Sequence, residues 1–187
     1  MLFRSVPVIE IARQLAEAGR GRPGGEFWIM RYLGVEFASG SSGKALEACE
    51  PFIADERLSL ATRTAVALRQ TYYLTQGRGE RERTERAWSR AESLLAQLAK
   101  TGAAIPLVRQ VDRLQVRSEM ERLRGDLAGT VATLRESIGV ARRWFEAELA
   151  RSGSNARDLV LLDAQSWLDG SQGMLIYGLA SPFVRGR

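Results

Sequence analysis

Apolar residues recur at intervals of three and four along three successive segments of this chain. The first stripe comprises Leu58, Ala61, Ala65, Leu68 and Tyr72; the second Ala87, Ala91, Leu94 and Leu98; the third Leu127, Val131, Leu134, Ile138, Ala141 and Phe145. Side chains at this spacing share one face of an α-helix. Because each such face must be covered by a partner, the pattern predicts an all-α fold of antiparallel helical hairpins, either solenoid-like or an irregular helical bundle.

Helix boundaries follow from proline, glycine and capping residues. The expected helices are 7–18, 26–37, 44–52, 55–76, 80–100, 105–124, 127–150 and 156–169. The apolar pattern of 26–37 fits a buried helix or a strand, and a helix is favoured because no second strand is evident to pair with it. Pro51 is expected to interrupt the third of them, and Gly77 and Gly125 are typical of helix ends. These signals divide the chain into three parts. They are an N-terminal arm with a Gly-rich loop (1–40), a helical-hairpin domain (41–170) and a short C-terminal segment (171–187).

The composition excludes several classes of active site. The chain has no histidine, which removes catalytic sets that depend on an imidazole base and His-containing metal sites. The single cysteine, Cys49, cannot form an internal disulfide and is expected to be a buried thiol in a reducing compartment. We therefore expect no catalytic residues, no cofactor and no metal.

Two features bear on localisation. Glu10 lies within the apolar N-terminal stretch and argues against a secretion signal. The apolar stretch 173–184 is about 12 residues long, whereas a bilayer-spanning helix needs roughly 20. The sequence thus predicts a soluble, cytoplasmic protein with no membrane partner.

The segment 119–138 resembles a tetratricopeptide repeat, a helical hairpin of about 34 residues. Gly125 lies at the family's turn between helices, Leu127 follows two residues later, and Leu134 takes the aromatic position. Thr130 and the pair Ser137 and Ile138 fall where small and large residues are expected. Gly77 is a second candidate turn, but the two turns lie 48 residues apart and not a multiple of 34. The resemblance covers about a third of the chain and implies a concave face that binds another polypeptide without catalysis.

A short glycine-containing segment, Gly40 to Lys44, is similar to a phosphate-binding loop, with Asp163 as a candidate magnesium ligand. However, Ala38 replaces the first glycine of that motif and Ala45 replaces its hydroxyl residue. The residues between this loop and Asp163 are expected to be helical, whereas nucleotide-binding folds of this class need parallel strands. A nucleotide-binding protein with a degenerate phosphate-binding loop is therefore the least favoured functional hypothesis.

Arginine supplies all but two of the 27 basic residues, against 22 acidic residues. Many of these arginines alternate with Glu at helix-surface spacing, which favours surface ion pairs. The remaining hypothesis is contact with a nucleic acid backbone. The residues proposed for it are Arg81, Arg83, Arg86, Arg90, Arg124, Arg142 and Arg143.

The function that the sequence favours is that of a non-catalytic helical protein-interaction module or a subunit of a larger assembly. Its partner would be another protein, and self-association is left open. The alternative is a small basic helical subunit that contacts RNA or single-stranded DNA in a ribonucleoprotein complex. The partner-binding face is expected where exposed aromatic and Arg groups coincide. It comprises Tyr73, Arg109, Arg113, Arg117 and Glu121.

Overall fold

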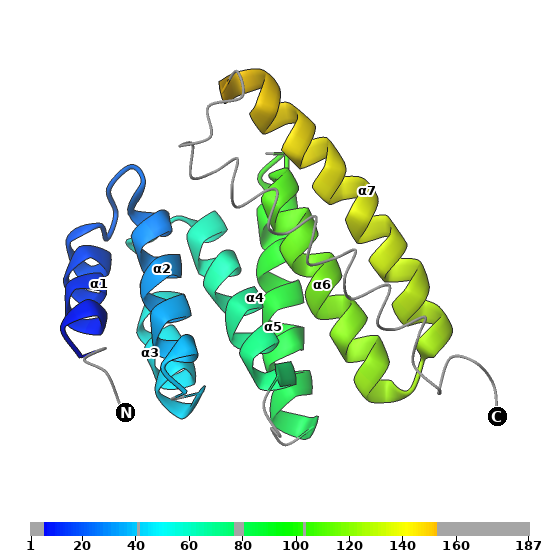
Figure 1. The fold of residues 1–187 in the computed structure, drawn as a ribbon, viewed down its shortest axis with the longest axis horizontal. Helices are drawn as coiled ribbons and strands as arrows, with labels where there is room; N and C mark the ends of the chain where they lie inside the picture. Colours follow the sequence, from blue (N-terminus) through cyan, green and yellow to red (C-terminus); the bar gives the residue numbers. More distant parts are fainter. Residues whose placement is uncertain (1–5, 41, 77–80, 103, 153–187) are drawn as a thin grey trace. The chain divides into compact units, whose positions relative to one another are not determined.

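The computed structural model describes residues 6–40, 42–76, 81–102 and 104–152, and these residues form seven α-helices and no strand (Figure 1). The helices are α1 (Val6–Ala18), α2 (Gly25–Ala38), α3 (Ser42–Ala54), α4 (Leu60–Gln76), α5 (Arg81–Lys100), α6 (Leu107–Arg124) and α7 (Leu127–Ser152). The predicted all-α class is confirmed. The expected helix 156–169 and the segment 171–187 lie outside the described residues.

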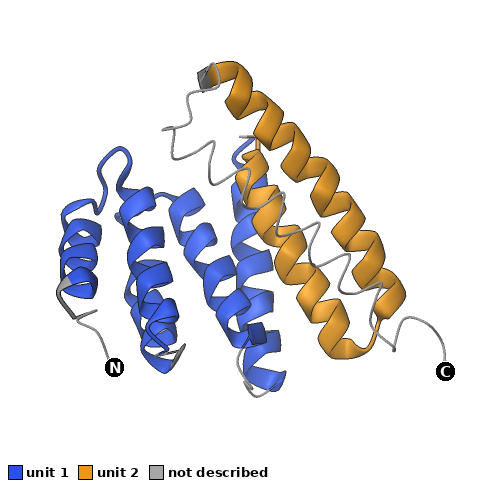
Figure 2. Ribbon diagram, in the orientation of Figure 1, with its two compact units in different colours: residues 1–103 blue, residues 104–187 orange. Residues whose placement is uncertain are grey.

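The chain divides into two compact units, residues 1–103 and 104–187 (Figure 2). In the first unit α1 packs on α2, α2 on α3 and α4, α3 on α4, and α4 on α5, while in the second α6 packs on α7. Helices adjacent in sequence therefore pack together within each unit, as expected for hairpins. This division differs from the boundary expected at residue 40, because α2 joins the N-terminal arm to the helices that follow it.

The helix α4 forms the centre of the first unit. Most of its side chains between Thr62 and Thr75 are buried, in keeping with its three neighbours α2, α3 and α5. Two of its buried threonines are satisfied within the helix, since the hydroxyl of Thr64 donates to the Leu60 carbonyl (2.7 Å) and that of Thr71 to the Ala67 carbonyl (2.9 Å). Local bonds of this kind let a polar side chain lie in an apolar core without an orphaned donor.

The start of α4 differs from the sequence prediction, which placed it at Asp55. The chain first makes a turn in which the Asp55 carboxylate accepts a hydrogen bond from the Arg57 backbone N–H (3.1 Å). The helix begins at Leu60, where the Ser59 hydroxyl accepts from the Thr62 N–H (3.1 Å). An aspartate that bonds nearby backbone favours a turn over a helix, and serine is a preferred N-cap.

The expected interruption of α3 at Pro51 is wrong, because the helix continues to Ala54. Pro51 lies in the last turn and its ring is exposed. A proline near the end of a helix removes one backbone hydrogen bond but leaves few turns to distort beyond it.

The connection between α6 and α7 consists of Gly125 and Asp126. Gly125 has φ +81°, a left-handed conformation that favours glycine, and its N–H donates to the Arg122 carbonyl (3.0 Å). The Asp126 carboxylate then accepts from the Gly129 N–H (2.8 Å) and caps α7. The turn expected at Gly125 is confirmed, while the resemblance to tetratricopeptide repeats stays a prediction.

The core between α6 and α7 is displaced from the predicted stripe of α7. Its buried centre contains Val111 and Leu114 of α6 and Val140, Ala141 and Trp144 of α7. Predicted members such as Val131, Ile138 and Phe145 are only half-buried. The small polar residues Thr130, Thr133 and Ser137 are buried in their place. Leu134 and Ala141 of the predicted stripe are buried as expected, but apolar spacing missed the rest of this face because three of its positions carry hydroxyl side chains.

Candidate functional site

The aromatic member of the predicted partner-binding face, Tyr73, is not at the surface. Its side chain is 1% exposed and stacks on Phe37 of α2, with ring centroids 4.2 Å apart and planes 6° from parallel. The neighbouring residue Tyr72 is the half-buried one of the pair. The expectation that Tyr73 is exposed is therefore wrong, because α4 is enclosed by helices on several sides.

The buried hydroxyl of Tyr73 has no hydrogen-bond partner, and burial raises the pKa of this phenol above its ordinary value. An unpaired buried hydroxyl costs about 1–3 kcal/mol. We therefore expect Tyr73→Phe to leave the stability unchanged or to raise it by about 1 kcal/mol, measured by urea unfolding. A loss of more than about 1 kcal/mol would show that the hydroxyl has a partner in solution.

Arg109 is likewise buried, where its guanidinium pairs with the carboxylate of Asp112 one turn away. Glu121 is also buried and accepts a hydrogen bond from Nε of Arg117 (2.8 Å). Arg113 and Arg117 are exposed. Thus the structure contradicts the exposure assumed for Arg109 and Glu121. Tyr73 belongs to a different compact unit from the other four residues, so they are not shown to share a face.

The remaining arginines proposed for nucleic-acid contact are exposed in the structure. They are Arg81, Arg83, Arg86, Arg90, Arg124, Arg142 and Arg143. Arg86 pairs with Glu82 (2.6 Å), as its spacing predicts, and Arg90 pairs with Glu50 of α3 (2.8 Å). These ion pairs reduce the positive charge that α5 can offer to a phosphate backbone.

Glu50 joins three helices of the first unit. Its carboxylate accepts hydrogen bonds from Gln70 of α4 (2.7 Å) and from Arg90 of α5 (2.8 Å). Burial alone would raise the pKa of Glu50, but the bonds from Arg90 and Gln70 outweigh it and lower the pKa. The contribution of this carboxylate to stability is therefore present above its ordinary pKa of about 4.3 and is lost as the pH falls through its lower value in the folded chain.

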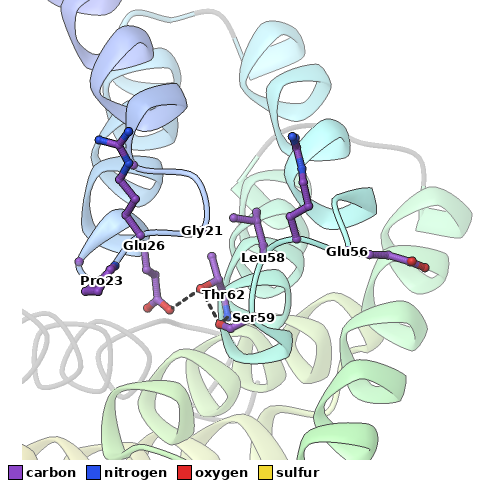
Figure 3. Close-up of a pocket in the computed structure, with 11 residues that line it drawn as sticks. Gly21, Pro23, Glu26, Glu56, Leu58, Ser59 and Thr62 are labelled. Carbon is purple, nitrogen blue, oxygen red and sulfur yellow. Dashed lines mark hydrogen bonds between the residues drawn. The ribbon is translucent and has the colours of Figure 1, made fainter.

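A cavity of about 680 Å³ lies in the first unit, between the loop 19–24 and the connection 56–59 (Figure 3). On one side the carboxylate of Glu26 accepts a hydrogen bond from the Thr62 hydroxyl (3.1 Å), which also bonds the Ser59 hydroxyl (2.9 Å). Glu56 points away from these groups. The cavity lining is of mixed charge, since Arg22 and Arg57 lie in it together with the two glutamates.

The two walls of this cavity are joined by Arg20. Its guanidinium pairs with Asp55 (2.8 Å) and lies 4.4 Å from the centroid of the Phe52 ring. Hydrogen bonds from Arg57, and then from Arg20, hold the pKa of Asp55 well below its ordinary value. Through these contacts Arg20 ties the loop to α3 and to the turn that follows it.

The phosphate-loop candidate lies in a different setting from a working loop of that class. Gly40 follows α2, and Lys44 is an exposed residue in the first turn of α3. The segment therefore connects two helices, whereas that class places the loop between a strand and a helix. Asp163 lies outside the described residues.

Cys49 is fully buried, as expected from its apolar neighbours, and burial raises the pKa of its thiol to about 12. Only the thiolate reacts with disulfide reagents. We therefore expect the folded chain to react with Ellman's reagent slower than the urea-unfolded chain by a factor on the order of 1,000 or more. Equal rates in the two states would contradict the burial of this residue.

The clearest exposed apolar surface of the first unit lies on α1. Val8 and Ile11 are each 56% exposed and Leu15 is 37% exposed. Their spacing of three and four residues aligns them along one side of the helix, which we call the open α1 face. Trp28 in the first turns of α2 is also 41% exposed. Helical spacing alone places Val8, Ile11 and Leu15 on one side of a helix, but it does not show whether that side is covered.

The charged residues of α1 lie away from the open α1 face. Glu10 bonds Arg13 (2.7 Å) and Gln14 (2.9 Å), and Glu17 bonds Arg20 (2.8 Å). At roughly 100° per residue, Glu10, Arg13 and Glu17 fall within one arc on the other side of the helix. The open α1 face is thus bordered by uncharged residues, and this surface is suited to apolar contact.

Comparison of the chain with protein-family models, with curated proteins and with solved structures gave no match. Within the described ranges, no group of three metal-ligating side chains comes together. In the same ranges, none of the helices combines the length and the apolar character needed to cross a bilayer.

Proposed function

We propose that this chain is a non-catalytic helical interaction module whose open α1 face binds an apolar helix of a polypeptide partner. The observation that supports this proposal is the exposure of Val8, Ile11 and Leu15 in a row at helical spacing. Three apolar anchors at positions i, i+3 and i+7 form the pattern by which one helix recognises another. Exposed apolar side chains that gather on one face, in contrast to scattered ones, are typical of interaction sites.

The alternative, contact with RNA or single-stranded DNA, has weaker support. Of the proposed arginines on α5, Arg86 and Arg90 are already paired with carboxylates. A phosphate-binding surface would give an affinity that falls steeply with rising salt. A filter-binding titration of mixed-sequence RNA at two salt concentrations separates the two functions, because apolar binding through α1 does not depend on phosphate.

Photo-crosslinking tests the proposed function directly. A photoreactive amino acid is introduced at position 11 on the open α1 face, or at position 13 on the charged side, and the full chain is expressed in its native host. We expect a discrete crosslinked polypeptide from position 11 and little from position 13. The absence of any adduct from position 11, or equal adducts from both positions, would contradict the proposal.

A further inference from the structure

The apolar arc of α1 is wider than one neighbouring helix can cover. It runs from Ile11 through Leu15, Val8, Ala12 and Ala16, and on to Ile9, which spans roughly 160° at 100° per residue. Ala16 has no exposed surface, whereas Ile11 and Val8 are more than half exposed. Among the described helices α1 packs on α2 alone. One half of the arc is therefore covered by α2, and the other half has no neighbour among the described helices.

The uncovered half is centred roughly 100° around the helix from the half that packs on α2. A helix in a four-helix bundle has two neighbours at about this angle, and its apolar arc is correspondingly wide. The arc of α1 thus fits a bundle in which two further helices complete the pair α1 and α2.

We propose that the missing neighbours are α1 and α2 of a second copy of this chain, so that two copies form a symmetric four-helix bundle. This inference rests on the proposed function and names the partner of the same face. In an antiparallel pair of α1 helices related by a two-fold axis, Ile11 lies opposite Leu15 of the second copy, and Val8 lies opposite Ala18. Each apolar side chain then meets an apolar or small one.

The distribution of charge favours a second copy over a different protein. Glu10, Arg13 and Glu17 all lie on the far side of α1, and the residues that border the open α1 face, Ala12 and Gln14, are uncharged. Like charges opposite each other destabilise an interface between copies. Two identical α1 faces can meet without this repulsion. Interfaces that select a different partner commonly use charge at their rims, and the α1 residues at this rim are uncharged, so that Arg31 of α2 is the nearest exposed charge that the second copy must accommodate.

The size of the face determines how strongly the copies associate. The helix α1 has 13 residues and is therefore roughly 20 Å long. A stable interface buries about 1,200–2,000 Å², more than one pair of helices this short provides. Trp28 of α2, which is 41% exposed, adds apolar surface to a bundle that also includes α2. We therefore expect a reversible dimer, with monomer and dimer both populated at the protein concentrations used in solution measurements.

Sedimentation velocity of the full chain tests this inference. The wild-type mass should rise from one chain to two with increasing concentration. Ile11→Glu and Val8→Glu, which place an unpaired charge in the contact, should each weaken association roughly 100-fold or more. The matched control is Leu123→Glu on α6, where the leucine has a similar exposure of 42%, and it should dimerise as the wild type does. Circular dichroism and thermal melting would show that each variant is folded.

A mixed-disulfide experiment tests the direction of pairing. Tagged Ile11→Cys protein is mixed with untagged Leu15→Cys protein under oxidising conditions. The antiparallel arrangement predicts that the mixed pair forms more disulfide than either variant with itself. A parallel arrangement predicts the reverse and would overturn the proposed geometry.

Different results would overturn the dimer and the proposed interaction function. A wild type that stays monomeric at every concentration, or a Leu123→Glu variant that dissociates as Ile11→Glu does, would overturn the dimer. If position 11 then crosslinks to a different polypeptide, the interaction function stands with another partner. If position 11 gives no adduct at all, both proposals are wrong.

Discussion

Replacement of Gly25 by alanine is expected to destabilise the first unit by roughly 3 kcal/mol or more. The end of α1 and the start of α2 meet at Gly19 and Gly25 with no side chain between them. A Cβ atom added to Gly25 would lie 1.8 Å from the Gly19 carbonyl oxygen. Because the obstructing atom is backbone, neither helix can yield by rotating a side chain, and α1 must shift away from α2.

Gly34→Ala is the matched control for this prediction. Gly34 lies inside α2, and a Cβ atom there would meet no atom within 4 Å. Since glycine inside a helix costs roughly 0.5–1 kcal/mol relative to alanine, Gly34→Ala should be neutral or stabilising. Urea unfolding followed by circular dichroism measures both variants, and amide exchange in α1 shows where stability is lost. A Gly25→Ala variant as stable as Gly34→Ala would mean that α1 and α2 do not approach this closely.

The second large effect is expected for Trp144→Ala, which should cost about 3–5 kcal/mol of the stability of the hairpin α6–α7. Trp144 is 6% exposed and belongs to the cluster with Val111 and Leu114 of α6. Its removal leaves a cavity that two helices joined by a short turn cannot easily close. Loss of amide protection across α6 and α7 would locate the effect in the second unit.

Phe145→Ala provides the comparison, because the sequence stripe placed Phe145 in the core and the structure leaves it half-buried. Its substitution should cost about half as much as that of Trp144, since the hydrophobic contribution scales with the apolar area buried. If Phe145→Ala proved the more damaging change, the buried face of α7 would be the one that the apolar spacing predicts.

The helices themselves were largely predictable because their signals are local. The Gly125–Asp126 turn follows from glycine in a left-handed conformation and an aspartate cap, and the two helices that it joins begin or end close to the predicted residues. The start of α4 was missed because Asp55 bonds Arg57 and forms a turn where apolar spacing suggested a helix. Local bonding of this kind competes with helix formation and is not visible in hydrophobic periodicity.

The candidate site was less predictable because it depends on which helix packs where. Tyr72 and Tyr73 are neighbours on the same helix, and only the packing of α2 on α4 decides that Tyr73 stacks on Phe37. Arg109 lies four residues before the exposed Arg113, yet it is buried with Asp112. For α1 the residue spacing is consistent with an apolar side, but the exposure of Ile11 follows from the absence of a second neighbour among the described helices.

Thiol labelling in intact host cells tests whether another polypeptide covers the open α1 face in the working protein. Because Cys49 is buried, an introduced thiol can be labelled selectively with a membrane-permeable maleimide. Ile11→Cys and the control Leu123→Cys should label at similar rates in dilute purified protein, since the two side chains have comparable exposure. In cells we predict that labelling at position 11 is strongly slowed while labelling at position 123 is not. Equal labelling of both positions in cells would mean that no polypeptide covers the open α1 face.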